Sequence, residues 1–142
     1  MDRTIKPMTI RQLRETFLKI DFPEYQREPD LWTKDQKQRL IDSILREFDV
    51  ASIYMYQKDD GGLECIDGRQ RLNAIMSFLG ANPLDEVDNG FALKFHNEIS
   101  SSPNPFASLD TQTFRDIETQ PDAPDAAAAL SVLLGYELNV VY

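Results

Sequence analysis

A glycine followed by two arginines is the feature of this sequence whose residue types and spacing suit chemistry. In the stretch IDGRQRLNA (66–74), an apolar, strand-like run gives way to a helical pattern. A helix start leaves backbone N–H groups without partners and carries the positive end of the helix dipole. Glycine lets backbone approach a ligand closely, and arginine offers forked donors that match phosphate oxygens. We therefore expect Gly68, Arg69 and Arg71 to form a phosphate-binding corner, with Asp67 orienting an arginine, a ribose or a metal ion.

A structural interpretation of the same stretch stays open beside this one. Glycine followed by charged residues also forms ordinary turns, in which the arginines pair with neighbouring carboxylates. A Walker-type loop and a dinucleotide fingerprint are excluded, because neither GxxxxGK[ST] nor GxGxxG occurs in the chain. The spacing alone leaves a phosphate site and a structural turn as alternatives.

A second polar cluster, PEYQR (23–27), precedes the first strongly amphipathic segment. No helical or strand period explains Gln26 and Arg27. Tyr25 and Trp32 flank them, and either ring could stack on a base, although a role as a core anchor explains Trp32 better. This cluster is a second candidate for ligand contacts.

The elements around these clusters predict a mixed α/β fold. Thr9 and Thr33 each begin a capping box, and apolar residues follow both at helical spacing. Two runs rich in β-formers, joined by a glycine-containing turn, predict a hairpin. A helix is expected from about Gln70 to Gly80. The expected elements are helices after Thr9 and Thr33, hairpin strands at 53–56 and 63–66, a helix at 70–80, a strand at 91–95, a short helix at 111–118, a helix from Asp125 to Leu134, and a strand at 138–142.

Length and composition favour one soluble domain. The 142 residues are enough for a single core, and no apolar run approaches the roughly 20 residues that cross a bilayer. The start of the chain lacks the apolar core of a signal peptide, so we expect a cytoplasmic protein without a membrane partner. The single cysteine, Cys65, excludes an internal disulfide and a cysteine-based zinc site. The single histidine, His96, is expected in a surface loop.

Acidic charge is concentrated in the second part of the chain. Residues 81–142 hold 2 Lys and Arg against 10 Asp and Glu, whereas residues 1–80 hold 13 against 14. A net charge of −9 repels a phosphate backbone at long range. We therefore do not expect direct binding to duplex DNA, whereas a small anion needs only a few well-placed donors.

Taken together, the two clusters resemble those of the ParB/sulfiredoxin-like superfamily. Within it, they are similar to the group with a DGQQR motif, best known from the N-terminal part of GmrSD-type modification-dependent restriction systems. Residues 23–27 resemble its P-x-Y-Q-R motif, and residues 40–45 resemble the helix that follows. Residues 66–74 resemble IDGQQRLTA and satisfy the wider G-x-x-R-x-x-A pattern. The resemblance covers about residues 20–80.

The resemblance implies a single nucleotide-binding domain over 1–142, built as a small mixed sheet with flanking helices. In restriction-type relatives, such a domain is held to bind and hydrolyse a nucleoside triphosphate with Mg²⁺ and so to gate a nuclease domain. By this resemblance the nucleotide-binding residues are Tyr25, Gln26, Arg27, Gly68, Arg69, Arg71 and Asn73, and the catalytic residues are Asp67, Arg69, Gln70 and Arg71, with Asp67 also binding Mg²⁺.

Two departures limit what the resemblance implies. Arg69 replaces the first glutamine of DGQQR, which adds positive charge but removes an amide. One histidine cannot build an HNH-type nuclease site, so a nuclease would be a domain or subunit supplied elsewhere. Sulfiredoxin activity would need a cysteine within the G-x-x-R stretch, where this chain has Arg69 and Gln70.

Two other functions stay open at this point. One is a non-catalytic protein-interaction domain that retains the anion pocket, and the other is a ParB-like DNA-binding regulator. The final strand stops at the end of the chain, which suggests one piece of a longer protein or completion by a partner.

Overall fold

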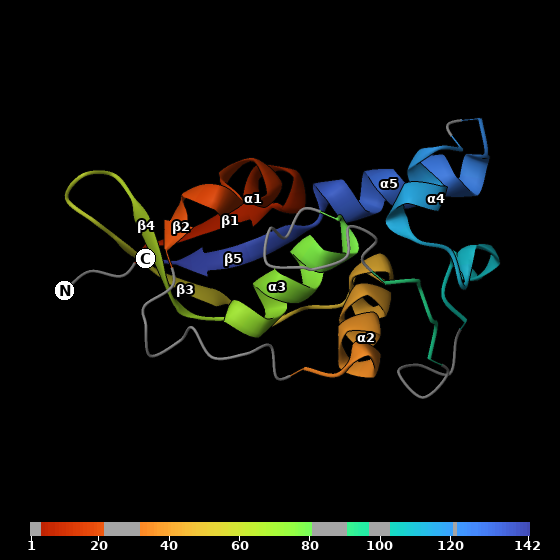
Figure 1. The fold of residues 1–142 in the computed structure, drawn as a ribbon, viewed down its shortest axis with the longest axis horizontal. Coiled ribbons are helices and arrows are strands. Elements are labelled where there is room, and N and C mark those ends of the chain that lie inside the picture. Colours follow the sequence, from red (N-terminus) through yellow and green to blue (C-terminus); the bar gives the residue numbers. More distant parts are fainter. Residues whose placement is uncertain (1–3, 22–31, 81–90, 97–102, 121) are drawn as a thin grey trace.

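A five-stranded mixed sheet organises the molecule (Figure 1). The computed structural model describes residues 4–21, 32–80, 91–96, 103–120 and 122–142. The strand order is β1-β5-β3-β4-β2; β1–β5 and β3–β4 are antiparallel pairs, and β3–β5 and β2–β4 are parallel pairs. The predicted mixed α/β fold is confirmed. The strands are β1 (Ile5–Thr9), β2 (Ile20–Asp21), β3 (Ile53–Gln57), β4 (Leu63–Asp67) and β5 (Glu137–Val141).

One face of the sheet joins the core and the other faces solvent. In β3, buried Ile53 and Met55 alternate with exposed Tyr54 and Tyr56. The first four residues of β5 alternate in the same way. Because successive side chains of a strand point to opposite faces, the helices pack on the face that carries Ile53 and Met55. The described helices leave the other face bare.

Side-chain caps fix where three of the helices begin. Thr9 and Thr33 each accept a hydrogen bond from the N3 backbone N–H, and the glutamine three residues on returns a bond to the threonine N–H. Both predicted capping boxes are thus present, and Thr113 forms a third that was not predicted. A cap of this kind contributes about 1 kcal/mol. The helices are α1 (Ile10–Thr16), α2 (Lys34–Leu45), α3 (Arg69–Phe78), α4 (Phe114–Glu118) and α5 (Pro124–Gly135), with 3-10 helices at Phe17–Lys19 and Ala107–Leu109.

Three aromatic rings connect α3 to the later part of the chain. The Phe78 ring lies 5.4 Å from that of Phe91 and 5.9 Å from that of Phe114, measured between centroids. Both contacts are tilted or edge-on, the geometry that aromatic pairs prefer. They hold α4 and the irregular segment 91–96 against the C-terminal end of α3.

A buried polar network fastens the segment that contains His96 to α2. Asp42 Oδ1 accepts from Arg46 Nε at 2.9 Å and from Asn104 Nδ2 at 2.6 Å, and Asp42 Oδ2 accepts from the His96 backbone N–H at 2.8 Å. The His96 Nε2 atom lies 2.9 Å from Asp35 Oδ1. The expectation that His96 is a surface residue is therefore wrong. The residue is only 4% exposed, because its backbone and ring bind two carboxylates of α2.

Other differences from the sequence predictions have local causes. Residues 91–95 form no strand, although Leu93 exchanges backbone hydrogen bonds with the Thr111–Gln112 turn. The cap of α5 is Ala123 rather than Asp125, because Pro124 occupies the first helical position, where its fixed φ suits the helix. The strands β1 and β2 were not predicted.

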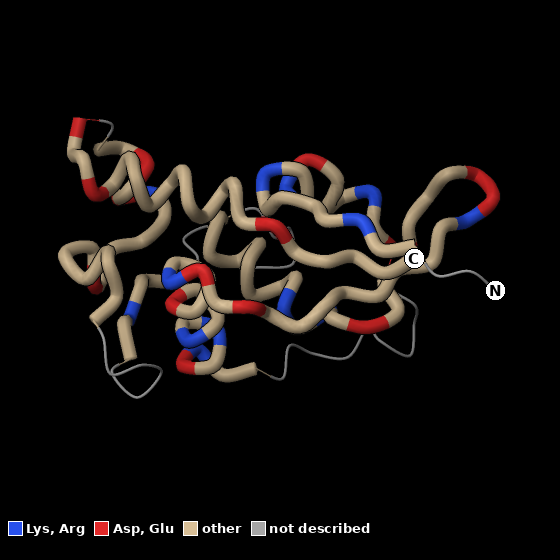
Figure 2. Tube along the Cα trace, turned by 180° about the vertical axis from the view of Figure 1, so that it is seen from behind, with Lys and Arg blue, Asp and Glu red and all other residues tan. Residues whose placement is uncertain are grey.

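Charge is distributed unevenly over the fold (Figure 2). Basic residues gather around α1 and α2, whereas acidic residues dominate the α4–α5 end and the turn of the β3–β4 hairpin. The acidic second part of the sequence thus includes one end of the molecule. Within the described residues, no helix is long and apolar enough to cross a membrane.

Candidate functional site

The junction between β4 and α3 requires glycine at position 68. Gly68 has φ +106°, a left-handed conformation that side chains rarely adopt. A Cβ atom there would also lie 3.0 Å from Ile53 Cγ1 and 3.3 Å from Arg71 Nη2. The glycine therefore lets the chain turn from strand to helix while backbone, strand β3 and an arginine come close together.

Arg71 is held by one end of its guanidinium group. Its Nη2 donates to the carbonyl oxygen of Ser52 at 2.8 Å, just before β3 begins. Its Nε is buried and has no hydrogen-bond partner in the segments that the structure describes. The side chain is thus fixed in direction but retains a buried donor, which suits an arginine that binds an anion.

Two amide side chains near Arg71 have acceptors without partners. Gln70 Oε1 and Asn73 Oδ1 are both buried and make no hydrogen bond within the described part of the chain, and Asn73 is only 3% exposed. A buried polar atom left unsatisfied costs about 1–3 kcal/mol, so such atoms usually meet a ligand or ordered water. The start of α3 therefore concentrates hydrogen-bonding capacity that the described residues do not use.

Asp67 and Arg69 flank Gly68 in different surroundings. Asp67 is exposed, and in the β3–β4 register it pairs with Tyr54. Paired residues share a face of a sheet, so Asp67 lies on the bare face, at the very end of its strand. Arg69 is half-buried at the first position of α3. The acidic and basic members of the motif thus meet at one corner of the sheet.

The pKa of the Cys65 thiol reflects its burial and the charges of the neighbouring motif residues. Burial, and then the Asp67 carboxylate, raise the pKa of Cys65 to about 11, whereas Arg71 and Arg69 act in the opposite direction. A thiol with so high a pKa is protonated at neutral pH and is a poor nucleophile. The prediction that this chain lacks sulfiredoxin chemistry is consistent with this environment.

The structure brings part of the predicted site together. Gly68, Arg69, Gln70, Arg71 and Asn73 all lie on the first turns of α3 or at its cap. The other predicted cluster, residues 25–27, lies outside the described residues. Sequence reasoning missed Ser52, since the residue contributes only a backbone carbonyl and belongs to no motif.

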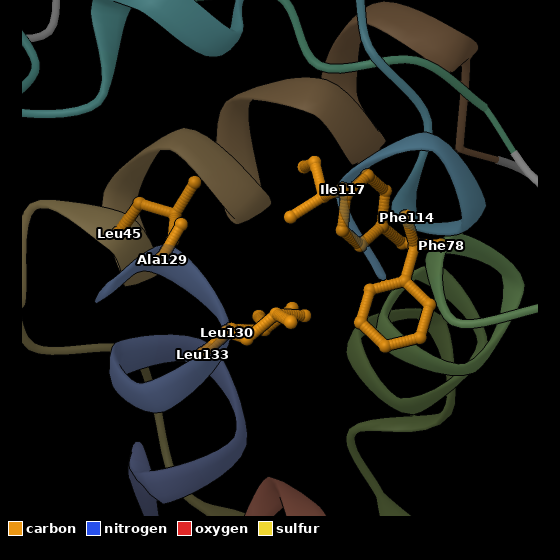
Figure 3. A pocket seen from close by; sticks show the side chains of 7 residues that line it. All are labelled: Leu45, Phe78, Phe114, Ile117, Ala129, Leu130 and Leu133. Atoms are coloured by element: carbon orange, nitrogen blue, oxygen red, sulfur yellow. The ribbon is translucent and has the colours of Figure 1, made fainter. Parts of the chain in front are cut away.

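An apolar pocket lies elsewhere, between α2, α3, α4 and α5 (Figure 3). Its cavity volume is only about 10 Å³, and it opens in part to solvent. Phe78 lines it from the far end of α3, roughly 10 Å along the helix axis from Arg71. A charged ligand would gain nothing from these walls, so this pocket is separate from the arginine site. The lining residues are Leu45, Phe78, Phe114, Ile117, Ala129, Leu130 and Leu133.

Comparison with known families identifies one family whose model matches most of the chain. The model of the family described as GmrSD restriction endonuclease, N-terminal domain, matches residues 10–132. The match runs from the start of α1 into α5 and includes the whole β4–α3 junction. Comparison with curated proteins and with solved structures finds no match. The chain therefore belongs to the family of GmrSD restriction endonuclease N-terminal domains, and so to a restriction or defence system.

Proposed function

We propose that this domain binds a nucleoside triphosphate at the β4–α3 junction and hydrolyses it, as the nucleotide-dependent part of a restriction system. The proposal is carried by one observation: near the left-handed Gly68, the buried atoms Gln70 Oε1, Arg71 Nε and Asn73 Oδ1 have no hydrogen-bond partner among the described residues. Buried donors and acceptors without partners at a helix start suit a ligand with both phosphate oxygens and polar groups.

The phosphate groups would lie against the first turn of α3. Its backbone N–H groups and the helix dipole favour negative charge, and Gly68 allows close approach. Arg71 would donate from Nε while its Nη2 stays on the Ser52 carbonyl. Arg69 adds a second positive charge, and residues 25–27 would close over the ligand.

Gln70 supports a role in turnover. Its Oε1 is an acceptor, and an amide in such a position can orient the water that attacks a terminal phosphate. Asn73 would bind the ligand through its amide.

The donor set suits Mg²⁺ only as an ion shared with the phosphates. Among the described residues there is no group of three or more His, Cys, Asp or Glu side chains arranged to hold a metal. Mg²⁺ typically takes one or two carboxylates and completes its shell with phosphate oxygens and water. Asp67 fits as a single carboxylate ligand of this kind. The bound ion would neutralise charge on the phosphates.

Titration calorimetry with each common nucleoside triphosphate and Mg²⁺ tests binding. Arg71→Ala should weaken affinity by about tenfold or more, because a hydrogen bond to a charged group contributes about 1.5–3 kcal/mol. Arg115→Ala, which removes an exposed arginine of α4, is the matched control and should bind as the wild type does. No detectable heat from the wild type at millimolar nucleotide would defeat the proposal.

Phosphate release tests hydrolysis separately. Gln70→Leu removes the amide while roughly keeping side-chain size, so turnover should fall while nucleotide affinity changes little. A second candidate is a domain that binds nucleotide without turnover and acts as a protein-interaction module. Arg69 favours it, because a guanidinium stands where the resembling motif has an amide. Tight binding by the wild type without phosphate release would select this second candidate.

A further inference from the structure

The sheet face that the helices leave bare carries most of the exposed large hydrophobic side chains of the described residues. These would ordinarily be buried or scattered singly, and a contiguous group of them commonly marks an interaction site. Six such side chains are exposed, and four of them lie on this face: Ile5 (65%), Tyr54 (40%), Tyr56 (53%) and Ile66 (39%). We call these four residues the bare-face patch.

Strand register places the members of the patch on the same face of the sheet. Val141 of β5 pairs with Ile5 of β1 on one side and with Tyr54 of β3 on the other, so the three side chains form one row. Ile66 lies opposite the irregularity between Tyr54 and Met55, where a bulge leaves it exposed beside Asp67. Val141 itself is buried (8% exposed), so the exposed side chains of the patch come from β1, β3 and β4.

The charges on this face are mostly acidic among the described residues; its cation Lys58, in the turn after β3, pairs with Asp21, which lies beside Glu64 in the β2–β4 register. Glu64 pairs with Tyr56, and Asp67 pairs with Tyr54, which places both carboxylates beside the patch. Glu137 precedes the buried Leu138 and is exposed on the bare face as well. Strands β3, β4 and β5 contain no lysine or arginine.

The lysine of β1 lies on the other face of the sheet. Lys6 pairs with Val140, which is fully buried in the core. Because paired residues share a face, Lys6 belongs to the opposite side of the sheet. The bare face thus combines aromatic and aliphatic side chains with an acidic surround.

We propose that this face docks a positively charged protein segment that also presents aliphatic side chains. Its aliphatic groups would cover the bare-face patch, and its lysines or arginines would meet Glu64, Asp67 and Glu137. Tyrosine suits such a contact because its ring offers area at low entropic cost and attracts cations over its face. Tyrosine is also enriched at protein interfaces, whereas lysine is depleted.

Charge argues for this occupant over the others. Two copies of the chain meeting patch to patch would bring Glu64, Asp67 and Glu137 against their own counterparts, which is repulsive. The same carboxylates repel duplex nucleic acid and anionic lipid surfaces. Only a basic partner gains from both the apolar and the acidic parts of this face.

The test uses the whole chain and a synthetic peptide of alternating arginine and leucine. Amide chemical shifts of isotope-labelled protein should change at the bare-face patch, and fluorescence anisotropy should show affinity that falls with added salt. Replacing both tyrosines (Tyr54→Thr with Tyr56→Thr) should weaken binding by about tenfold or more, because aromatic anchors dominate interfaces. Threonine preserves strand propensity, and both side chains are exposed, so the variant should fold.

Two matched controls distinguish binding at this face from nonspecific binding of the peptide. Leu18→Thr removes a side chain that is 78% exposed but lies on the 3-10 helix, and it should leave affinity unchanged. Glu64→Lys with Glu137→Lys should abolish binding, whereas the exposed α4 change Glu118→Lys should not. Shifts located elsewhere, equal binding of a glutamate–leucine peptide, or an equal loss in Leu18→Thr would each overturn the proposal. Self-association that the tyrosine variant disperses would overturn it too, in favour of a second copy.

Discussion

The backbone N–H of His96 donates to Oδ2 of Asp42 at 2.8 Å, between residues 54 positions apart in the sequence. Both side chains are buried, and Arg46 and Asn104 bind the other carboxylate oxygen. The Asp42 carboxylate thus binds Arg46 within α2 and also binds two later residues, His96 and Asn104, which lie outside the helices and strands. The first prediction concerns this carboxylate.

Removing the Asp42 carboxylate should strongly destabilise the domain. Asp42→Ala removes the ion pair between Asp42 and the Arg46 guanidinium, which is 4% exposed, and breaking a buried pair typically costs about 3–5 kcal/mol. The free energy of unfolding in urea measures the loss. Asp49→Ala, at an exposed position, should change it by less than about 0.5 kcal/mol. Similar losses in the two variants would contradict the role of the network.

Gly68→Ala should lower the free energy of unfolding through a conformational cost and a steric cost. A comparison with Gly61→Ala separates the two. A left-handed conformation costs a non-glycine residue about 1–2 kcal/mol, and here the new Cβ would also press on Ile53 at 3.0 Å. Gly61 also has a left-handed φ, +88°, but a Cβ added there would have no described neighbour within 4 Å. Gly61→Ala therefore has the conformational cost without the steric one. Urea unfolding should therefore rank Gly68→Ala as the more destabilised variant. The reverse order would show that the close approach at Gly68 is unimportant.

Acid should weaken the contact between Asp35 of α2 and His96. Hydrogen bonds from Arg39 and then His96 lower the pKa of Asp35 from 3.8 to about 2. Because the folded-state pKa is depressed, this contribution is fully present above about pH 4 and is lost as the pH falls towards 2. Thermal melting across that range should show the loss in the wild type. Asp35→Asn should show a smaller decline, and identical profiles would contradict the assignment.

The Cys65 thiol should resist alkylation in the folded protein. Burial raises its pKa from 9.0 to about 11, so little thiolate exists at about pH 8. Labelling with iodoacetamide should be slow in buffer and fast in urea. The same shift means that the stability contributed by the protonated thiol is complete below pH 9 and declines as the pH rises towards 11. Equal labelling rates in the two conditions would show that the thiol is accessible.

Local patterns in the sequence determined the elements that carry the site. The two threonine capping boxes, the hairpin and the helix after Gly68 all formed as predicted, because each depends on residues within about four positions of one another. The GRQR stretch at 68–71 likewise predicted, from local pattern alone, a glycine turn followed by arginines at the start of a helix. The family resemblance also rested on these local motifs, and the family match over residues 10–132 confirmed it.

Tertiary structure alone decided how distant parts meet. The pairing of β1 with β5 joins the two ends of the chain, the Ser52 carbonyl holds Arg71, and Asp42 buries His96. None of these contacts has a local signal, since a backbone carbonyl carries no side-chain identity and a lone histidine looks the same in a loop or in a core. Which sheet face stays bare also depends on where all the helices pack. Sequence therefore specified the start of the arginine helix, and long-range packing specified what surrounds it.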